Sequence, residues 1–122
     1  MIACAIALGP ATGIMANDAD VRDAPGRASD GVGERAWPLP LFSDSKAPLE
    51  RRVADLKNLG DRTGGALTAG SFIQEWVAEG LPWARLDIAG SAWSAKDLPC
   101  CPRGATGIGV RTLPRRLAAL GP

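Results

Sequence analysis

The fold is decided by the stretch Trp83-Ala84-Arg85-Leu86-Asp87-Ile88-Ala89-Gly90-Ser91-Ala92-Trp93. Within it, residues 86–89 predict a short strand. Before it, Gly80 and Pro82 mark the end of a helix, since neither residue continues a helix well. That helix is predicted over residues 66–79, where the apolar side chains share one broad face. They are Leu67, Phe72, Ile73, Trp76 and Val77.

The segment upstream predicts a second strand and an uncertain helix. Gly13 to Ala16 is a short apolar run typical of a buried strand, and Asn17-Asp18 then offers a helix N-cap. Pro25-Gly26 interrupts residues 18–35, and a proline costs about 3 kcal/mol and a glycine about 1 kcal/mol inside a helix. A continuous helix here is therefore expected to be weak. Residues 37–41, Trp-Pro-Leu-Pro-Leu, predict an extended connection stiffened by proline.

The remaining segments complete an α/β pattern. Residues 1–9 fit either a buried helix or a strand, residues 48–52 predict a helical turn, and residues 53–59 predict a strand. Residues 94–104 predict a loop, and residues 105–120 a final helix, kinked at Pro114. Its inward residues are predicted to be Val110, Leu113, Leu117 and Leu120. Because strands alternate with helices, we expect an α/β fold in which helices flank a partial mixed sheet.

Size and charge limit the classes of function. The 122 residues suffice for one domain, and 14 basic against 13 acidic residues give a net charge of +1. Such a chain has no electrostatic footprint for nucleic acid or for an anionic membrane. The longest apolar run, Met1 to Leu8, is far shorter than the roughly 20 residues of a membrane span. It also lacks the positive residues of a signal peptide, so we expect a cytoplasmic protein.

The chain is poor in nucleophilic and metal-binding patterns. It contains no histidine, which excludes a Ser-His or Cys-His pair within this sequence. Its three cysteines are an odd number, which argues against a disulfide framework. Cys100 and Cys101 are adjacent and lack the spacing of a zinc finger or ribbon, so they are expected to be loop thiols rather than zinc ligands.

Three further features each have a functional and a structural interpretation. Asp55 and Asp87 lie in strand-like segments and have the chemistry of metal ligands or of a general acid or base. Two isolated aspartates do not make a two-metal site, so we expect Asp87 to be a hydrogen-bonded structural carboxylate. Gly64-Gly65 has the backbone N–H groups of an anion site, but a close-packed helix start is favoured. The four tryptophans are expected to be core or interface anchors.

Five segments follow one another in a specific order: Ala3 to Gly9 with Thr12 to Asn17, Trp37 to Leu41, Ala54 to Gly60 with Gly64 to Ala69, Trp83 to Gly90, and Arg103 to Gly107. The first resembles the segment that follows the T-L-T-G turn of the leucyl aminopeptidase (cytosol aminopeptidase) family. The second resembles its W-x-L-P-L motif and the third its A-D-x-x-N-x-G…G-G-x-x-T-A block. The last two resemble W-A-H-L-D-I-A-G and K-G-A-T-G.

The resemblance implies that residues 1–122 are the C-terminal portion of an aminopeptidase catalytic domain. The family fold is an α/β sheet between helices, assembled as a hexamer. The family removes N-terminal amino acids from peptides with two divalent ions, zinc or manganese, which polarise the scissile carbonyl and activate a water. By position, Ala89 and Ala92 line the substrate-binding pocket for the first side chain. Both are small, which implies a roomy apolar pocket.

The sequence also departs from the family. The metal-ligand motifs, including N-T-D-A-E-G-R, match no position here, so we expect no catalytic residue or metal ligand in this chain and no activity from it alone. The alternative is a non-catalytic fragment that packs with full-length subunits or has no function. Ile2 falls at the glycine of the T-L-T-G turn, which a misassigned start, a frameshift or a split gene would explain. Arg85 replaces the usual histidine and Asp61 a usual glycine.

Overall fold

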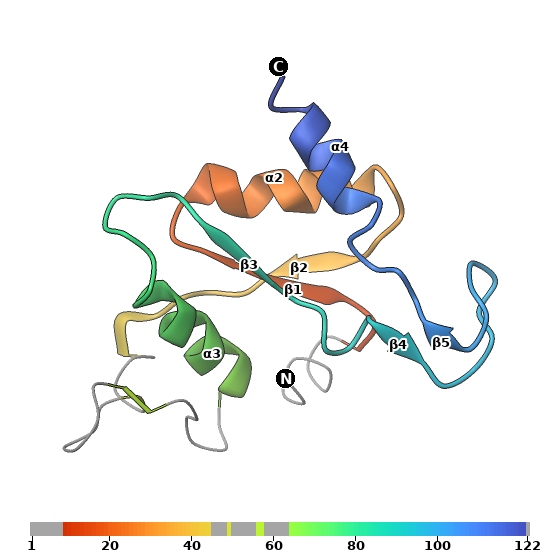
Figure 1. The fold of residues 1–122 in the computed structure, drawn as a ribbon, viewed down its shortest axis with the longest axis horizontal. Coiled ribbons are helices and arrows are strands. Elements are labelled where there is room, and N and C mark those ends of the chain that lie inside the picture. The colour runs from red at the N-terminus through yellow and green to blue at the C-terminus, as the bar shows by residue number, and fades with distance from the viewer. Residues whose placement is uncertain (1–8, 45–48, 50–55, 58–63, 122) are drawn as a thin grey trace.

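The computed structural model describes residues 9–44, 49, 56–57 and 64–121. Its centre is a three-stranded sheet in the order β2-β1-β3, flanked by helices on both faces, and a separate two-stranded sheet, β4-β5, lies beside it (Figure 1). The helices α2 and α4 lie on one side of the central sheet and α3 lies on the other. The predicted class, a small mixed sheet flanked by helices, is therefore confirmed.

The middle strand, β1 (Thr12–Ala16), organises the sheet. It pairs in parallel with β2 (Ala36–Pro38) and antiparallel with β3 (Ala84–Asp87). Successive side chains of a strand point to opposite faces. Ile14 accordingly lies on the side of α2 and α4, Met15 lies against α3, and both are almost completely buried. The strands predicted at 13–16 and 86–89 are therefore present, the second one beginning two residues earlier.

The helix α2 (Ala19–Asp30) is continuous through Pro25-Gly26, so the prediction of a weak, interrupted helix was wrong. Its N-cap is the predicted one, because an Asp18 carboxylate oxygen accepts hydrogen bonds from two N–H groups of the first turn, at 2.9 and 3.1 Å. Pro25 is buried and lines a cavity together with Ile14 of the sheet. Packing of the ring against the sheet offsets the cost of the missing N–H, which the local sequence does not reveal.

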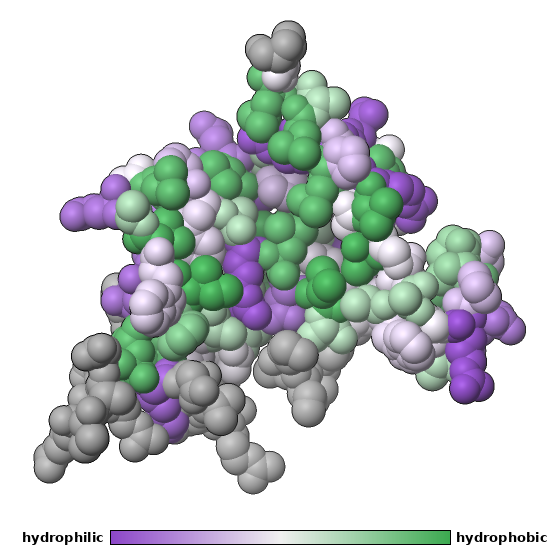
Figure 2. Space-filling model, in the orientation of Figure 1, coloured by the Kyte–Doolittle hydropathy of each residue, from purple (hydrophilic) through white to green (hydrophobic). Residues whose placement is uncertain are grey.

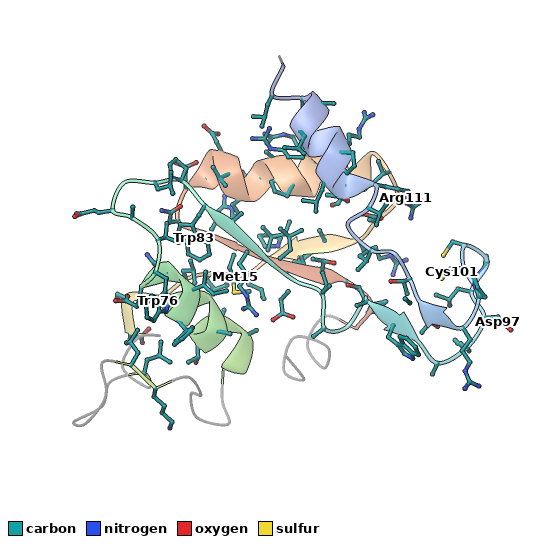
Figure 3. The ribbon with its side chains drawn as sticks, viewed as in Figure 1. Met15, Trp76, Trp83, Asp97, Cys101 and Arg111 are labelled. Atoms are coloured by element: carbon teal, nitrogen blue, oxygen red, sulfur yellow. The ribbon has the colours of Figure 1, made fainter. Side chains whose placement is uncertain are left out.

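The helix α3 (Gly65–Gln74) buries a different face from the one predicted. Its buried residues are small: Ala66, Thr68, Gly70 and Ser71. Ile73 and Trp76 are exposed instead, Trp76 by 71%. The reason is close packing, because a Cβ atom at Gly70 would lie only 2.8 Å from the Sδ atom of Met15. Figure 3 shows Met15 directed at this helix. The helix also ends five residues before the predicted Glu79.

The last helix, α4 (Thr112–Ala118), is shorter than the predicted helix over 105–120. The four side chains predicted to point inward are all exposed, so that prediction was also wrong; they are Val110, Leu113, Leu117 and Leu120. Thr112 is the buried residue of α4. Pro114 lies in the first turn, where backbone N–H groups have no partner inside the helix, so it causes no kink.

The predicted loop 94–104 is a small hairpin. Its two strands, β4 (Trp93–Ser94) and β5 (Gly104–Ala105), pair antiparallel, and a bridge joins Leu98 to Cys101 near its tip. Of the four tryptophans only Trp83 is buried, so the prediction of core anchors holds for that residue alone within this fold.

Several predictions lie outside the described residues. They include the segment 1–8, most of the predicted strand 53–59 with Asp55, and all but Leu49 of the predicted turn 48–52. Among the described residues, no helix has the length and hydrophobicity that spanning a bilayer requires.

Candidate functional site

The candidate site is the turn of residues 88–92, which connects β3 to β4. The N–H groups of Ser91 and Ala92 both donate to the carbonyl of Ile88, at 3.0 and 2.9 Å. These bonds fold the chain back on itself directly after the strand. The turn brings together both residues that the sequence assigns to a substrate pocket, Ala89 and Ala92, and both are half-buried.

Two threonines from distant segments hold this turn in place. The hydroxyl of Thr12, at the start of β1, lies 3.0 Å from the hydroxyl of Ser91, and both residues are buried. On the other side, the Thr106 hydroxyl donates to the Ser91 carbonyl at 2.6 Å, and the Thr106 N–H donates to the Ala92 carbonyl at 3.0 Å. The backbone that carries Ala89 and Ala92 is therefore held by hydrogen bonds from two distant segments of the chain.

The carboxylate of Asp87 supports the turn from the strand side. It is buried, and one oxygen accepts a 3.1 Å hydrogen bond from the N–H of Ala89. The other oxygen lies 3.3 Å from the Nη2 atom of Arg85, whose Nη1 atom donates at 3.0 Å to the carbonyl of Ala66 in α3. Asp87 is thus the hydrogen-bonded structural carboxylate that the sequence predicts, and Arg85 joins the site to α3.

A second buried carboxylate, Glu34, fixes the segment that follows Thr106. It accepts hydrogen bonds from the N–H of Gly109 at 3.1 Å, from both the N–H and the hydroxyl of Thr112, at 3.1 and 2.5 Å, and from the Nε atom of Arg111 at 3.3 Å. Burial alone raises the pKa of Glu34, but these bonds, the Thr112 hydroxyl first, outweigh it and lower the pKa below its ordinary value.

Sequence reasoning did not identify Thr12, Ser91, Thr106 or Glu34 as parts of this arrangement. The donors to Glu34 lie 75 to 78 residues further along the chain, so no local pattern marks that residue. The partners Thr12 and Ser91 are 79 residues apart. The available signal was Thr106 within Arg-Gly-Ala-Thr-Gly, a polar residue at the centre of a recognisable motif.

The described residues do not fit a two-metal centre. They contain no group of three or more histidine, cysteine, aspartate or glutamate side chains arranged to hold a metal ion. Asp87 is engaged by Arg85 and Ala89, and Asp55 lies outside the described part of the chain. Gly64, with a φ of 62°, is the left-handed residue before α3, which agrees with a helix start at the glycine pair.

Comparison with known proteins gives a consistent set of relatives. A probable cytosol aminopeptidase from Syntrophobacter fumaroxidans is 50% identical over 109 residues, which cover 88% of this chain and 22% of that protein. The structure of a tomato leucine aminopeptidase mutant matches with a TM-score of 0.90 and 32% identity, over 98% of this chain and 23% of the other. The bottromycin maturation enzyme BotP matches with a TM-score of 0.94 and 35% identity, over 98% and 27%.

A second structure of BotP, in complex with Mn, matches with a TM-score of 0.88 over 97% of this chain and 26% of the other. The chain therefore spans about a quarter of the length of the relatives it matches. The model of the cytosol aminopeptidase family, catalytic domain, matches residues 2–114. Since that match covers nearly every residue of the sequence, this chain belongs to the cytosol aminopeptidase family.

Proposed function

We propose that this chain is the C-terminal segment of a metal-dependent aminopeptidase catalytic domain and that Ala89 and Ala92 form part of its substrate pocket. The observation that carries the proposal is the turn 88–92, which is held on one side by Thr12 and on the other by Thr106. A pocket wall needs backbone that does not move when a substrate binds, and these hydrogen bonds supply that rigidity.

The substrate class is a peptide with a free N-terminus. Two small side chains on a fixed turn leave space for an apolar side chain, and binding such a group stabilises a complex in proportion to the apolar area that it buries. The chain's own residues bind and orient the N-terminal residue. Divalent ions such as manganese or zinc would supply the polarisation of the scissile carbonyl and the activation of water, and we assign their ligands to sequence outside this chain.

The exposed apolar side chains at α4 support the proposal that this chain is a segment of a larger catalytic domain. Leu113 and Leu117 of α4 are exposed, as is Leu120 just after it, and Figure 2 shows hydrophobic side chains gathered around this helix. Contiguous exposed apolar surface marks sites that another protein surface covers. Because the chain spans about a quarter of its relatives, the remainder of the catalytic domain is the natural covering segment. A cytoplasmic homo-oligomer, a hexamer, is the assembly that we propose for the whole protein.

A chimeric enzyme tests the proposed function. In the probable aminopeptidase of Syntrophobacter fumaroxidans, the 109 matched residues are replaced by the corresponding residues of this chain. We expect the purified chimera to release N-terminal leucine from a leucyl anilide in the presence of Mn²⁺ and to lose that activity after chelation. A chimera that folds and assembles like the parent enzyme, yet is inactive with added Mn²⁺, would overturn the proposal.

The isolated chain gives the complementary test. We expect the purified 122-residue chain to show no metal-dependent peptidase activity, because the metal ligands are assigned to sequence outside it. Robust hydrolysis by this chain with Mn²⁺ or Zn²⁺, abolished by a chelator, would contradict that assignment.

A further inference from the structure

The tip of the β4–β5 hairpin holds two neighbouring thiols in a defined backbone. The N–H of Leu98 donates to the carbonyl of Cys101 at 2.9 Å, and the N–H of Cys101 donates to the carbonyl of Leu98 at 3.2 Å. Pro99 and Cys100 are therefore the two central residues of a tight turn. The proline ring restricts φ at the first of these positions, which favours one turn conformation.

Side-chain hydrogen bonds hold the base of the same loop. The Asp97 carboxylate accepts a 2.8 Å hydrogen bond from the N–H of Arg103, which joins the two arms of the hairpin. The Ser94 hydroxyl donates to the carbonyl of Lys96 at 2.6 Å. Figure 3 shows Cys101 and Asp97 together in this loop, apart from the central sheet. The two cysteines thus lie on a shaped and accessible projection.

The two sulfur atoms lie side by side with no disulfide between them, and the Cys100 thiol donates a weak hydrogen bond to the Cys101 sulfur. The Sγ atoms of Cys100 and Cys101 are 4.0 Å apart, and both residues are free thiols. Cys100 is exposed and Cys101 is half-buried. A reagent in solution can therefore react with the exposed sulfur of Cys100. The sulfur of Cys101 is then close enough for the same atom of the reagent to bond to it as well.

The distance between the sulfurs discriminates between two kinds of bridge. A disulfide needs sulfurs about 2.05 Å apart and Cα atoms usually at least about 4.4 Å apart. Neighbouring Cα atoms across a trans peptide bond are only about 3.8 Å apart, which disfavours that bond here. By contrast, one atom bonded to both sulfurs holds them well apart: two bonds of about 2.3 Å at the tetrahedral angle, as zinc makes to thiolates, place sulfurs about 3.8 Å apart, and the narrower angle at pyramidal trivalent arsenic brings them somewhat closer. The 4.0 Å separation fits a one-atom bridge.

We propose that Cys100 and Cys101 form a dithiol site that binds trivalent arsenic compounds, with one arsenic atom joined to both sulfurs. With an organic arsenoxide, two S–H bonds break, two As–S bonds form, and the arsenic-bound oxygen leaves as water with both thiol protons. No atom changes oxidation state, so the step needs no oxidant or reductant. The organic substituent occupies the third position on arsenic and extends into solvent beside exposed Cys100.

The surroundings favour this ligand over a metal cation. A structural zinc site needs four ligands, whereas the described residues contain no group of three histidine, cysteine or acidic side chains suited to a metal. Trivalent arsenic with one organic group needs only two sulfurs. Burial and the neighbouring Cys100 raise the pKa of the Cys101 thiol, which keeps it protonated at neutral pH. Binding of the arsenoxide releases water and no net protons, so a raised thiol pKa does not weaken the adduct at equilibrium, whereas a cation must displace both thiol protons.

The test uses the reduced 122-residue chain and phenylarsine oxide, followed by intact mass spectrometry. We expect one arsenical per chain, with the loss of one water. Because two sulfurs on one loop act with a high effective concentration, the adduct should resist excess mercaptoethanol, a monothiol, and should be removed by dimercaptopropanol, a dithiol. The single variants Cys100→Ser and Cys101→Ser should each raise the half-maximal arsenical concentration by at least an order of magnitude, whereas Cys4→Ser should leave it unchanged.

Three results would overturn the proposal. The first is a monothiol-resistant adduct that survives in either Cys100→Ser or Cys101→Ser while far-ultraviolet circular dichroism matches the parent chain. The second is the loss of the adduct in Cys4→Ser. The third is a Cys100–Cys101 disulfide that forms faster than the arsenical adduct when the reduced chain is given oxidised glutathione, since the sulfur separation would then favour the direct bond.

Discussion

The carboxylate of Glu34 accepts a 2.5 Å hydrogen bond from the hydroxyl of Thr112 and a 3.1 Å hydrogen bond from its N–H. This pair joins the segment between α2 and β2 to the first residue of α4, although 78 residues separate them in sequence. Both residues are buried. Glu34 therefore helps to fix the position of α4 and of the turn at residues 108–111 that precedes it.

Replacement of that side chain should destabilise the protein. We expect Glu34→Ala to lower the free energy of unfolding by about 2–3 kcal/mol, because it leaves the buried hydroxyl and N–H of Thr112 without their charged acceptor. Urea unfolding monitored by circular dichroism measures the change. The matched control is Asp30→Asn at the exposed end of α2, for which a change within about 0.5 kcal/mol is expected. Equal effects at the two positions would show that Glu34 does not hold α4.

The contribution of Glu34 should depend on pH with a definite sign. Its pKa in the folded protein lies below the ordinary value of 4.5, so ionised Glu34 stabilises the fold. That stabilisation is complete above the unfolded value and is lost as the pH falls through the folded pKa. We therefore expect the difference in urea midpoint between the parent and Glu34→Gln to shrink progressively below about pH 4.5. A difference that is constant down to about pH 3 would contradict this.

Two glycine substitutions in helices should have opposite effects. At Gly70 a new Cβ atom would lie 2.8 Å from Met15 Sδ and 2.9 Å from Leu41 Cδ2, so Gly70→Ala should cost about 1–3 kcal/mol as α3 moves away from the sheet. At Gly26, in α2, nothing lies within 4 Å of the new atom. Gly26→Ala should therefore stabilise the protein by about 0.5–1 kcal/mol through helix propensity. Thermal unfolding of both variants, compared with the parent chain, measures the two changes in stability. A Gly70→Ala variant that melts at a higher temperature than the parent would show that α3 is not closely packed against the sheet.

Asn17 should control the entry to β3. Its side-chain amide donates to the carbonyl of Leu81 at 3.0 Å and accepts from the N–H of Trp83 at 2.9 Å, so it joins the end of β1 to the segment before β3. Asn17→Ala removes both bonds and should cost about 1–2 kcal/mol. Hydrogen exchange at the Trp83 amide should accelerate in Asn17→Ala and stay slower in Asn17→Asp, which keeps the acceptor. Equal exchange in the two variants would contradict the role of the acceptor.

The sequence predicted those elements whose signals are local. The strands near Ile14 and Leu86 and the Asp18 cap follow from short patterns, and the structure confirms them. The buried faces of α3 and α4 were predicted wrongly, because the prediction assumed that the most hydrophobic side chains of each helix point inward. In α3 the closest packing uses Gly70, a residue that carries no hydrophobic signal. In α4 the residue that is buried is Thr112, whereas Leu113 and Leu117 are exposed, so hydrophobicity alone did not identify the buried face.

The candidate site shows the same limit. Ala89 and Ala92 were identified only through the resemblance to a family, because two alanines carry no chemistry of their own. The residues that fix their turn, Thr12 and Thr106, make their hydrogen bonds across 79 and 15 residues. Pairings over such distances are set by the folded sheet and cannot be derived from local patterns.

The most direct test of the central claim is the substrate preference of the chimeric aminopeptidase with Ala92→Trp. We expect this substitution to lower kcat/KM for a leucyl anilide at least about tenfold relative to an alanyl anilide, because the indole fills space that a large N-terminal side chain needs. The control is Ala95→Trp, on the exposed part of the hairpin, which should leave the ratio unchanged. An unchanged ratio in an active Ala92→Trp chimera would show that the turn of residues 88–92 does not line the substrate pocket.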